Sequence, residues 1–91
     1  MKYKFDYSEE KNLILKETGK IGFEEIIEAI TKGDLIADLK HPKRENQRIF
    51  AVRIKNYIYS VPYVEDKKRN LAFLKTVYPS RKLTKTYMKG K

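Results

Sequence analysis

The sequence predicts an α+β fold: two helices near the amino terminus, an antiparallel sheet of three or four strands, and a short helix near the carboxyl terminus. Two patterns support this prediction. Hydrophobic side chains in residues 23–30 recur at helical spacing, whereas those in residues 47–78 alternate or form short runs rich in β-branched and aromatic residues. Polar turns separate these runs closely enough for hairpins, which join antiparallel strands. A chain of 91 residues suits one domain, so we expect residues 1–91 to fold as a single unit.

The first helix is expected to begin at Asp6 and to end near Thr18. The Asp6 side chain can cap the helix, and Glu9, three residues later, can complete a capping box. Gly19 can then adopt the left-handed conformation that commonly ends a helix. The hydrophobic stripe of this helix is narrow and consists of Tyr7, Leu13 and Ile14.

The second helix has a stronger hydrophobic pattern. Its large apolar side chains are spaced i, i+3, i+4 and i+7 and therefore share one face: Phe23, Ile26, Ile27 and Ile30. The acidic residues near its start, Glu24 first among them, suit the positive end of the helix dipole. Lys32 falls in the last turn, and Gly33 marks the end of the helix.

Three or four strands are expected after the second helix, since residues 35–39 could form a short strand. They cover residues 35–39, 47–54, 57–64 and 71–78, with polar loops at 41–46 and 65–70. Lys55-Asn56 fits a two-residue hairpin turn. Pro62 has no backbone N–H to donate, so it predicts an edge position or a bulge.

A final helix is expected from Arg81 to about Lys89. Pro79 should end the preceding strand, and the Ser80 hydroxyl can cap the helix. Lysines spaced i, i+3 and i+7 share one face of this helix and are candidates for RNA binding: Lys82, Lys85 and Lys89. The alternative is an ordinary solvated lysine face that binds nothing.

Charge is distributed unevenly along the chain. The net charge is +9, but residues 1–38 carry −3 and residues 39–91 carry +12. This asymmetry favours a polyanionic partner, either nucleic acid or an acidic protein. The absence of cysteine excludes disulfides and thiolate chemistry, and with a single histidine we expect neither a metal nor another cofactor. No segment has the character of a membrane span or a signal peptide.

Two residues occupy positions where chemistry could matter as well as charge. Lys75 lies in the most apolar predicted strand, on the same face as Phe73 and Val77, where it either projects into a cleft or lies on a solvated face. His41 opens a cationic loop and could act as a base, although a lone loop histidine more often has no catalytic role.

Seven tyrosines are many for a chain of this length. Tyr57, Tyr59 and Tyr63 alternate on one strand, and we expect them to pack in the core or at a protein interface more than to stack on bases. Tyr78 and Tyr87 flank the cationic turn and are better candidates for a site.

The order of elements and several short motifs resemble the BrnT branch of the RelE/ParE superfamily, the toxins of bacterial type II toxin–antitoxin pairs. The likeness spans nearly the whole chain. The motifs are Phe-Asp-Tyr at 5–7, Gly-Phe-Glu-Glu at 22–25, His41, Gln-Arg-Ile-Phe at 47–50, residues 75–84 from Lys75 to Thr84, and Tyr87.

The resemblance implies a metal-independent endoribonuclease that cleaves mRNA, on the ribosome or free, and so inhibits translation. The RNA 2′-hydroxyl would attack its own phosphate and leave a 2′,3′-cyclic phosphate. The implied catalytic residues are His41, Arg48, Lys75, Arg81 and Tyr87. The three cations would stabilise the phosphate charge, and the histidine or the tyrosine would move protons. Ser80 would bond a phosphate oxygen or only cap the helix.

The resemblance also implies a partner and a location. A small, acidic, DNA-binding antitoxin would cover the basic site, and the pair would act in the cytoplasm. Two other functions remain open from the residues alone. One is a non-catalytic basic module that binds nucleic acid or an acidic protein. The other is a ParE-like inhibitor of gyrase, which would share the fold but act on a protein.

Overall fold

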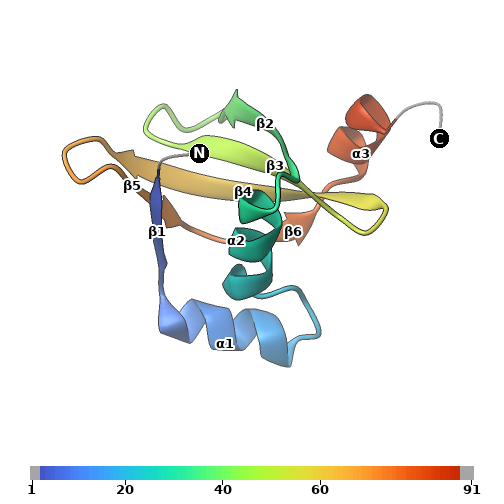
Figure 1. Cartoon of the computed structure of the whole chain (residues 1–91), viewed down its shortest axis with the longest axis horizontal. Coiled ribbons are helices and arrows are strands. Elements are labelled where there is room, and N and C mark those ends of the chain that lie inside the picture. The colour runs from blue at the N-terminus through green and yellow to red at the C-terminus, as the bar shows by residue number, and fades with distance from the viewer. Residues whose placement is uncertain (1–2, 89–91) are drawn as a thin grey trace.

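The structure, a computed structural model that describes residues 3–88, has an α+β fold (Figure 1). Its strands are β1 (Lys4–Tyr7), β2 (Leu35–Lys40), β3 (Arg48–Ile54), β4 (Tyr57–Asp66), β5 (Leu71–Leu74) and β6 (Tyr78–Pro79). Its helices are α1 (Glu9–Glu17), α2 (Phe23–Thr31) and α3 (Arg81–Tyr87). The expected fold class is confirmed. Within residues 3–88, no helix has the length and apolar character needed to cross a membrane.

The strands form one sheet in the order β1-β5-β4-β3-β2, and β6 pairs with β4 beyond the end of β5. Every pair is antiparallel except β1–β5, which is parallel. The expectation of an antiparallel sheet of three or four strands is therefore wrong in strand number and in this one pairing. The missed β1–β5 pair joins residues as distant as Lys4 and Leu71, so no local turn signal indicates it.

The segment before α1 is a strand and not the start of a helix. Lys4–Tyr7 forms β1, and Ser8, not Asp6, caps α1 by accepting a hydrogen bond from the backbone N–H of Lys11 at 3.2 Å. The Asp6 carboxylate instead accepts the backbone N–H of Tyr7 at 2.8 Å. Asp6 and Ser8 are both good capping residues, and the pairing of β1 with β5 decides between them because it keeps Asp6 extended.

The buried side of α1 is not the hydrophobic stripe that its sequence indicates. Leu13 and Ile14 are 58% and 49% exposed, whereas Asn12 and Leu15 face the core. Asn12 and Leu15 are three positions apart and so share a face of the helix. Gly19 ends the segment with a φ of +77°, as expected.

The amino terminus of α2 is capped from another helix. Asn12 accepts the backbone N–H of Phe23 on its Oδ1 at 2.8 Å, and Gly22 at the N-cap position makes no side-chain bond. A Cβ on Gly22 would lie 2.9 Å from that oxygen, so glycine leaves the room that the contact needs. A hydrogen bond from Asn12, and then Lys16 at 3.1 Å, lower the pKa of Glu24 in the first turn.

The helices α1 and α2 cover one face of the sheet, and α3 lies on the other side (Figure 1). The core between α1, α2 and the sheet is aromatic and branched-aliphatic. Phe50 and Tyr63 stack with ring centroids 3.8 Å apart, and Tyr59 packs against the same core with Tyr57 beside it. The expectation that the strand tyrosines pack against hydrophobic neighbours is thus confirmed for Tyr59 and Tyr63.

The central hairpin forms as expected, since Lys55 adopts a φ of +59° in the turn between β3 and β4. Pro62, however, lies in a central strand and not at an edge or a bulge. Its carbonyl accepts the N–H of Lys75 at 2.8 Å. The backbone N and O of one strand residue point to the same neighbouring strand. The Pro62 nitrogen therefore points to the gap between β5 and β6, where no strand partner requires an N–H donor.

The expected last strand, residues 71–78, is divided in two. β5 ends at Leu74, residues 75–77 leave the ladder, and β6 resumes pairing with β4 at Tyr78. Pro79 is the last residue of β6, so the strand ends there, one residue later than expected. Leu74 and Val77 are both buried, although strict alternation would place them on opposite faces. The break therefore separates Lys75 from the face of Val77.

Candidate nucleic-acid interface

The face of the sheet opposite α1 and α2 leads directly to α3. Phe50 and its partner Val61 point toward the helices. Their neighbours along the strands point the other way, so Ser60 and its partner Tyr78 lie on the opposite face. Tyr78 is 43% exposed there, the most exposed aromatic ring in residues 3–88.

Lys75 lies on the same face as Tyr78. Ala72 and Leu74 of β5 are in the core, so Phe73 and Lys75 alternate to the other side. Lys75 is exposed, and its Nζ lies 5.4 Å from the centroid of the Phe73 ring. Of the two alternatives for this residue, the structure has the solvated face and not the cleft.

Hydrogen bonds tie the start of α3 to the start of β4. The Thr84 Oγ1 accepts the N–H of Ile58 at 2.9 Å and donates to the Ser80 carbonyl at 2.7 Å. The Ser80 N–H donates to the Ile58 carbonyl at 3.0 Å. The Ser80 hydroxyl accepts the N–H of Leu83 at 3.1 Å, so its predicted capping role is confirmed. These bonds fix the direction in which α3 leaves the sheet.

The first turn of α3 carries positive charges, although negative charges stabilise the amino-terminal end of a helix. It contains Arg81 and Lys82 and no carboxylate, and cations at this end of a helix cost about 0.3–1 kcal/mol each. None of the ion pairs within residues 3–88 involves Lys75, Arg81, Lys82 or Lys85. These exposed charges are therefore available to an external anion. The fourth predicted RNA-binding lysine, Lys89, lies outside the described residues.

Lys75, Tyr78 and Arg81 line one stretch of the sheet. The backbone N–H of Lys75 donates a hydrogen bond to the carbonyl of Pro62, and that of Ser80 donates to the carbonyl of Ile58. Ile58 and Pro62 are four residue steps apart along β4, which is about 13 Å. Tyr87 does not join the group, because it lies six positions after Arg81 in the helix and so points elsewhere, 40% exposed.

Arg48 lies on the helix-covered side of the sheet and is already paired. Its Nε lies 3.0 Å from Asp38 Oδ1, and its Nη2 donates to the Asp38 carbonyl oxygen at 3.0 Å. The Tyr63 hydroxyl donates to both oxygens of the same carboxylate at 2.8 and 2.9 Å. The bond to Asp38 raises the pKa of Arg48. This network links the edge strand β2 to β3 and β4, so Arg48 has a structural task here.

Tyr63→Phe should lower the free energy of unfolding by about 1 kcal/mol at neutral pH, because it removes the bonds to Asp38. Burial, and then Asp38, raise the pKa of Tyr63. Above about pH 10 the unfolded chain therefore loses the Tyr63 proton while the folded protein keeps it, and stability falls by up to about 1.4 kcal/mol per pH unit.

Urea unfolding at pH 8 and pH 11 measures both effects of Tyr63→Phe. The variant should lose less stability than the wild type between these pH values. The control is Tyr57→Phe, because no hydrogen bond within residues 3–88 uses the Tyr57 hydroxyl. Equal alkaline losses in all three proteins would contradict the assignment.

His41 organises the loop between β2 and β3. Its Nδ1 accepts the backbone N–H of Lys43 at 3.1 Å and that of Arg44 at 3.2 Å. A nitrogen that accepts such bonds carries no proton, so the neutral ring carries its proton on Nε2. In this arrangement His41 can donate a hydrogen bond to a ligand, but it cannot act as a base without a change of tautomer.

The structure does not bring all the predicted catalytic residues together. His41 follows β2, which is three strand spacings, about 14 Å, from β5 and Lys75. Arg81 lies further still, at the opposite end of β4 from the Arg48–Tyr63 pair. Lys75, Tyr78, Ser80 and Arg81 thus follow one another along the sheet face away from α1 and α2, whereas Arg48 lies on the opposite face and His41 lies beyond β2.

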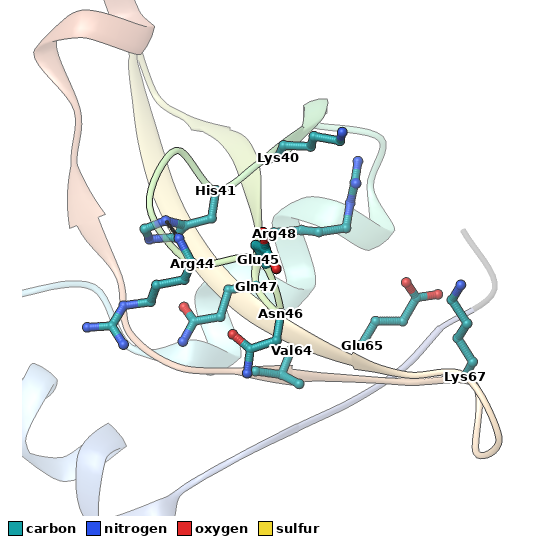
Figure 2. A pocket seen from close by; sticks show the side chains of 10 residues that line it. All are labelled: Lys40, His41, Arg44, Glu45, Asn46, Gln47, Arg48, Val64, Glu65 and Lys67. Carbon is teal, nitrogen blue, oxygen red and sulfur yellow. Dashed lines mark hydrogen bonds between the residues drawn. The ribbon is translucent and has the colours of Figure 1, made fainter.

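A cavity of about 590 Å³ lies at this second end, around the loop between β2 and β3 (Figure 2). Its lining is mixed and contains four cations, two carboxylates, two amides, His41 and Val64: Lys40, His41, Arg44, Glu45, Asn46, Gln47, Arg48, Val64, Glu65 and Lys67. Figure 2 shows the side chains of His41 and Arg48 pointing in opposite directions from the strands. Among residues 3–88, no three His, Asp or Glu side chains come together as a metal site.

The sequence indicates Tyr78 as a site candidate beside the cationic turn, but it gives no sign of the roles of Thr84 and Asp38. No local pattern could identify these two, because their partners are 26 and 25 positions away. Comparison of the chain with protein-family models, with curated proteins and with solved structures found no match.

Proposed function

We propose that this chain is the toxin of a bacterial type II toxin–antitoxin pair, a BrnT-like endoribonuclease with a RelE-like fold that cleaves mRNA and inhibits translation. The main support is the group formed by Lys75, Tyr78 and Arg81 on the sheet face away from α1 and α2. Its cations are exposed and have no acidic partner within residues 3–88. The cations in the first turn of α3 interact unfavourably with the helix dipole. A residue that opposes local stability in this way more often serves a function than the fold.

The proposed reaction is internal transesterification. The 2′-hydroxyl oxygen forms a bond to the adjacent phosphorus, and the bond from phosphorus to the 5′-oxygen breaks. The products are a 2′,3′-cyclic phosphate and a 5′-hydroxyl. Arg81 can hold two non-bridging oxygens with its planar guanidinium, and Lys75 adds a point charge. Both would act mainly by stabilising the charge that accumulates on the phosphorane.

Two proton transfers complete the reaction. One group accepts the proton of the 2′-hydroxyl, and another donates a proton to the departing 5′-oxygen. Tyr78 is the titratable side chain between Lys75 and Arg81, so we assign one of these transfers to its hydroxyl. The catalytic roles of His41, Arg48 and Tyr87 stay predictions, and their distance from this group leaves them outside the proposed centre.

The partner in this proposal is a small, acidic, DNA-binding antitoxin whose acidic segment covers the basic face, and the site of action is the cytoplasm. Charge complementarity supports this, since residues 39–91 carry a net charge of +12. Such a segment would compete with RNA for the same lysines and arginines. A short acidic reading frame encoded beside this one is therefore expected.

The end groups of cleaved RNA test the proposal. Purified protein, incubated with unstructured RNA in EDTA, should produce fragments with 2′,3′-cyclic phosphate and 5′-hydroxyl ends, as identified by mass spectrometry. Intact RNA, or fragments with 3′-hydroxyl ends, would contradict the proposed reaction. RNA binding without cleavage would favour the non-catalytic module, and inhibition of gyrase supercoiling would favour the ParE-like alternative.

Salt dependence measures how many cations contact the RNA. Contacts from Lys75, Arg81, Lys82 and Lys85 should give a slope of about −3 in a plot of log affinity against log salt, at about 0.7 per contact for single strands. Lys85→Ala should reduce the slope by about 0.7. Fluorescence anisotropy with a non-cleavable 2′-O-methyl oligonucleotide provides the measurement, and a slope near zero would exclude this surface.

A further inference from the structure

Four hydrogen bonds hold the loop between β2 and β3 in a defined conformation. The ring of His41 accepts the backbone N–H groups of Lys43 and Arg44 at 3.1 and 3.2 Å. The Gln47 N–H donates to the Arg44 carbonyl at 3.2 Å, and the His41 N–H donates to the Gln47 carbonyl at 3.4 Å. A loop fixed in this way loses little entropy when it contacts a ligand.

Two side-chain amides project from this ordered loop into the lining of the 590 Å³ cavity. They belong to Asn46 and Gln47, and within residues 3–88 no hydrogen bond uses either amide. In Figure 2 they extend on the side of the strands opposite to Arg48, together with the guanidinium of Arg44. Each amide presents one donor and one acceptor side by side, without a partner from the described part of the chain.

The composition of the cavity favours a nucleobase over a bare phosphate. Glu45, which follows Arg44 in the loop, also lines it, and a carboxylate among the cations disfavours a bare phosphate. A base edge has donors and acceptors together and fits a mixed lining. A planar amide pairs bidentately with adenine, and a guanidinium can stack on a base. The volume falls within the range of about 300–1,000 Å³ typical of small-ligand sites.

The cavity is placed to receive RNA that also contacts Lys75. Gln47 precedes the Arg48–Tyr63 pair by one residue, so it points to the sheet face that Lys75 occupies. Two strand spacings, about 10 Å, separate β3 from β5. A single strand that lies over Lys75 could therefore place a neighbouring base in the cavity.

We propose that Arg44, Asn46 and Gln47 form a nucleobase-binding subsite that gives the protein a base preference on single-stranded RNA. The proposal rests on the proposed function only in taking RNA as the ligand, and it requires no cleavage. The amides would read the base edge, and Arg44 would stack on the base or bind the adjoining phosphate. Adenine is the expected preferred base.

Binding of non-cleavable oligonucleotides tests the subsite. Eight-nucleotide 2′-O-methyl oligo(A), oligo(C) and oligo(U) lack the attacking hydroxyl, and their affinities can be measured by fluorescence anisotropy. The wild type should bind oligo(A) about tenfold more tightly than oligo(U), about 1.4 kcal/mol. The double variant Asn46→Ala/Gln47→Ala should bind all three equally and keep the salt slope of the wild type.

Lys43→Ala is the matched control, because Lys43 belongs to the same exposed loop but does not line the cavity. It should keep the base preference, whereas Arg44→Ala should weaken it. Circular dichroism confirms that each variant is folded. Equal affinity of the wild type for the three oligonucleotides, or a preference that survives loss of both amides, would overturn the subsite.

The outcomes separate this proposal from the ribonuclease. A base preference that depends on the amides, in a protein that leaves unmodified RNA intact, supports the subsite and contradicts the catalytic function. Cleavage of RNA without such a preference supports the catalytic function and overturns the subsite. Failure to bind any of the three oligonucleotides overturns the subsite as well.

Discussion

Arg81→Ala is expected to reduce the rate of RNA cleavage by about 10²–10³-fold, equivalent to about 2.7–4 kcal/mol of barrier, by analogy with loss of one oxyanion-stabilising donor. The expected loss follows from the position of Arg81. Ser80 and Thr84 tie the first turn of α3 to Ile58 and hold Arg81 at one end of the stretch that begins at Lys75. Single-turnover cleavage of a labelled RNA measures the rate. Induced expression in cells should change from growth arrest to normal growth.

Lys82→Ala is the matched control for Arg81→Ala. Lys82 has the same charge, is exposed and belongs to the same turn of α3. The helical rotation of 100° per residue directs it about 160° away from Thr84, which faces the sheet, whereas Arg81 lies about 60° from it. Its loss should slow cleavage only a few-fold, and low salt should restore the rate, because it contributes general attraction.

The stability of Arg81→Ala distinguishes a functional cation from a structural one. Removing a positive charge from the amino-terminal end of α3 should leave the free energy of unfolding unchanged or raise it by about 0.3–1 kcal/mol. A variant that is inactive because it is unfolded would show the reverse. Equal loss of activity in Arg81→Ala and Lys82→Ala would reject a specific role for Arg81.

Asn12→Ala is expected to lower the free energy of unfolding by about 2 kcal/mol, because it leaves a buried N–H without an acceptor. Asn12 is 2% exposed, and its Oδ1 accepts the N–H of Phe23, which is fully buried at the start of α2. Gly22 cannot substitute as a cap, because it has no side chain. The loss should also weaken the packing of α1 against α2, since this bond joins them.

Urea unfolding, followed by circular dichroism, measures the effect of Asn12→Ala. The control is Asn46→Ala, which removes the same chemical group from an exposed loop and should change stability by no more than about 0.5 kcal/mol. Gly22→Ala should also destabilise the protein, because its Cβ would lie 2.9 Å from Asn12 Oδ1. Similar stabilities of Asn12→Ala and Asn46→Ala would show that the cap contributes little.

Much of the fold could be predicted because its signals are local. Three features depend only on residues close together in the sequence, and each is present in the structure: the apolar spacing of α2, the Lys55-Asn56 turn and the Ser80 cap. Lys75, Ser80 and Arg81 were found by the same means, as hydroxyl and cationic residues around a strand end. Their grouping in space follows from the short connection between β5 and α3.

The rest of the fold depends on contacts between distant residues. Asp6 and Ser8 compete as caps, and only the pairing of β1 with β5 decides for Ser8. The sequence gives no partner for Arg48. In the structure, Arg48 forms an ion pair with Asp38 on the neighbouring strand. In the sequence, Asn12 is one polar residue of a weakly amphipathic helix. Its role as a cap is visible only in the structure, where it accepts the N–H of Phe23.

Local patterns in the chain are enough to indicate the α+β class, the separation of an acidic amino-terminal part from a basic remainder, and the helix that presents Arg81. Periodicity, capping and net charge are properties of neighbouring residues, so a single chain displays them. Only the folded arrangement places His41 and Arg48 away from Arg81, and Tyr78 between Lys75 and Arg81. These relations depend on the order and register of strands, which are set by burial and hydrogen bonding between segments distant in the chain.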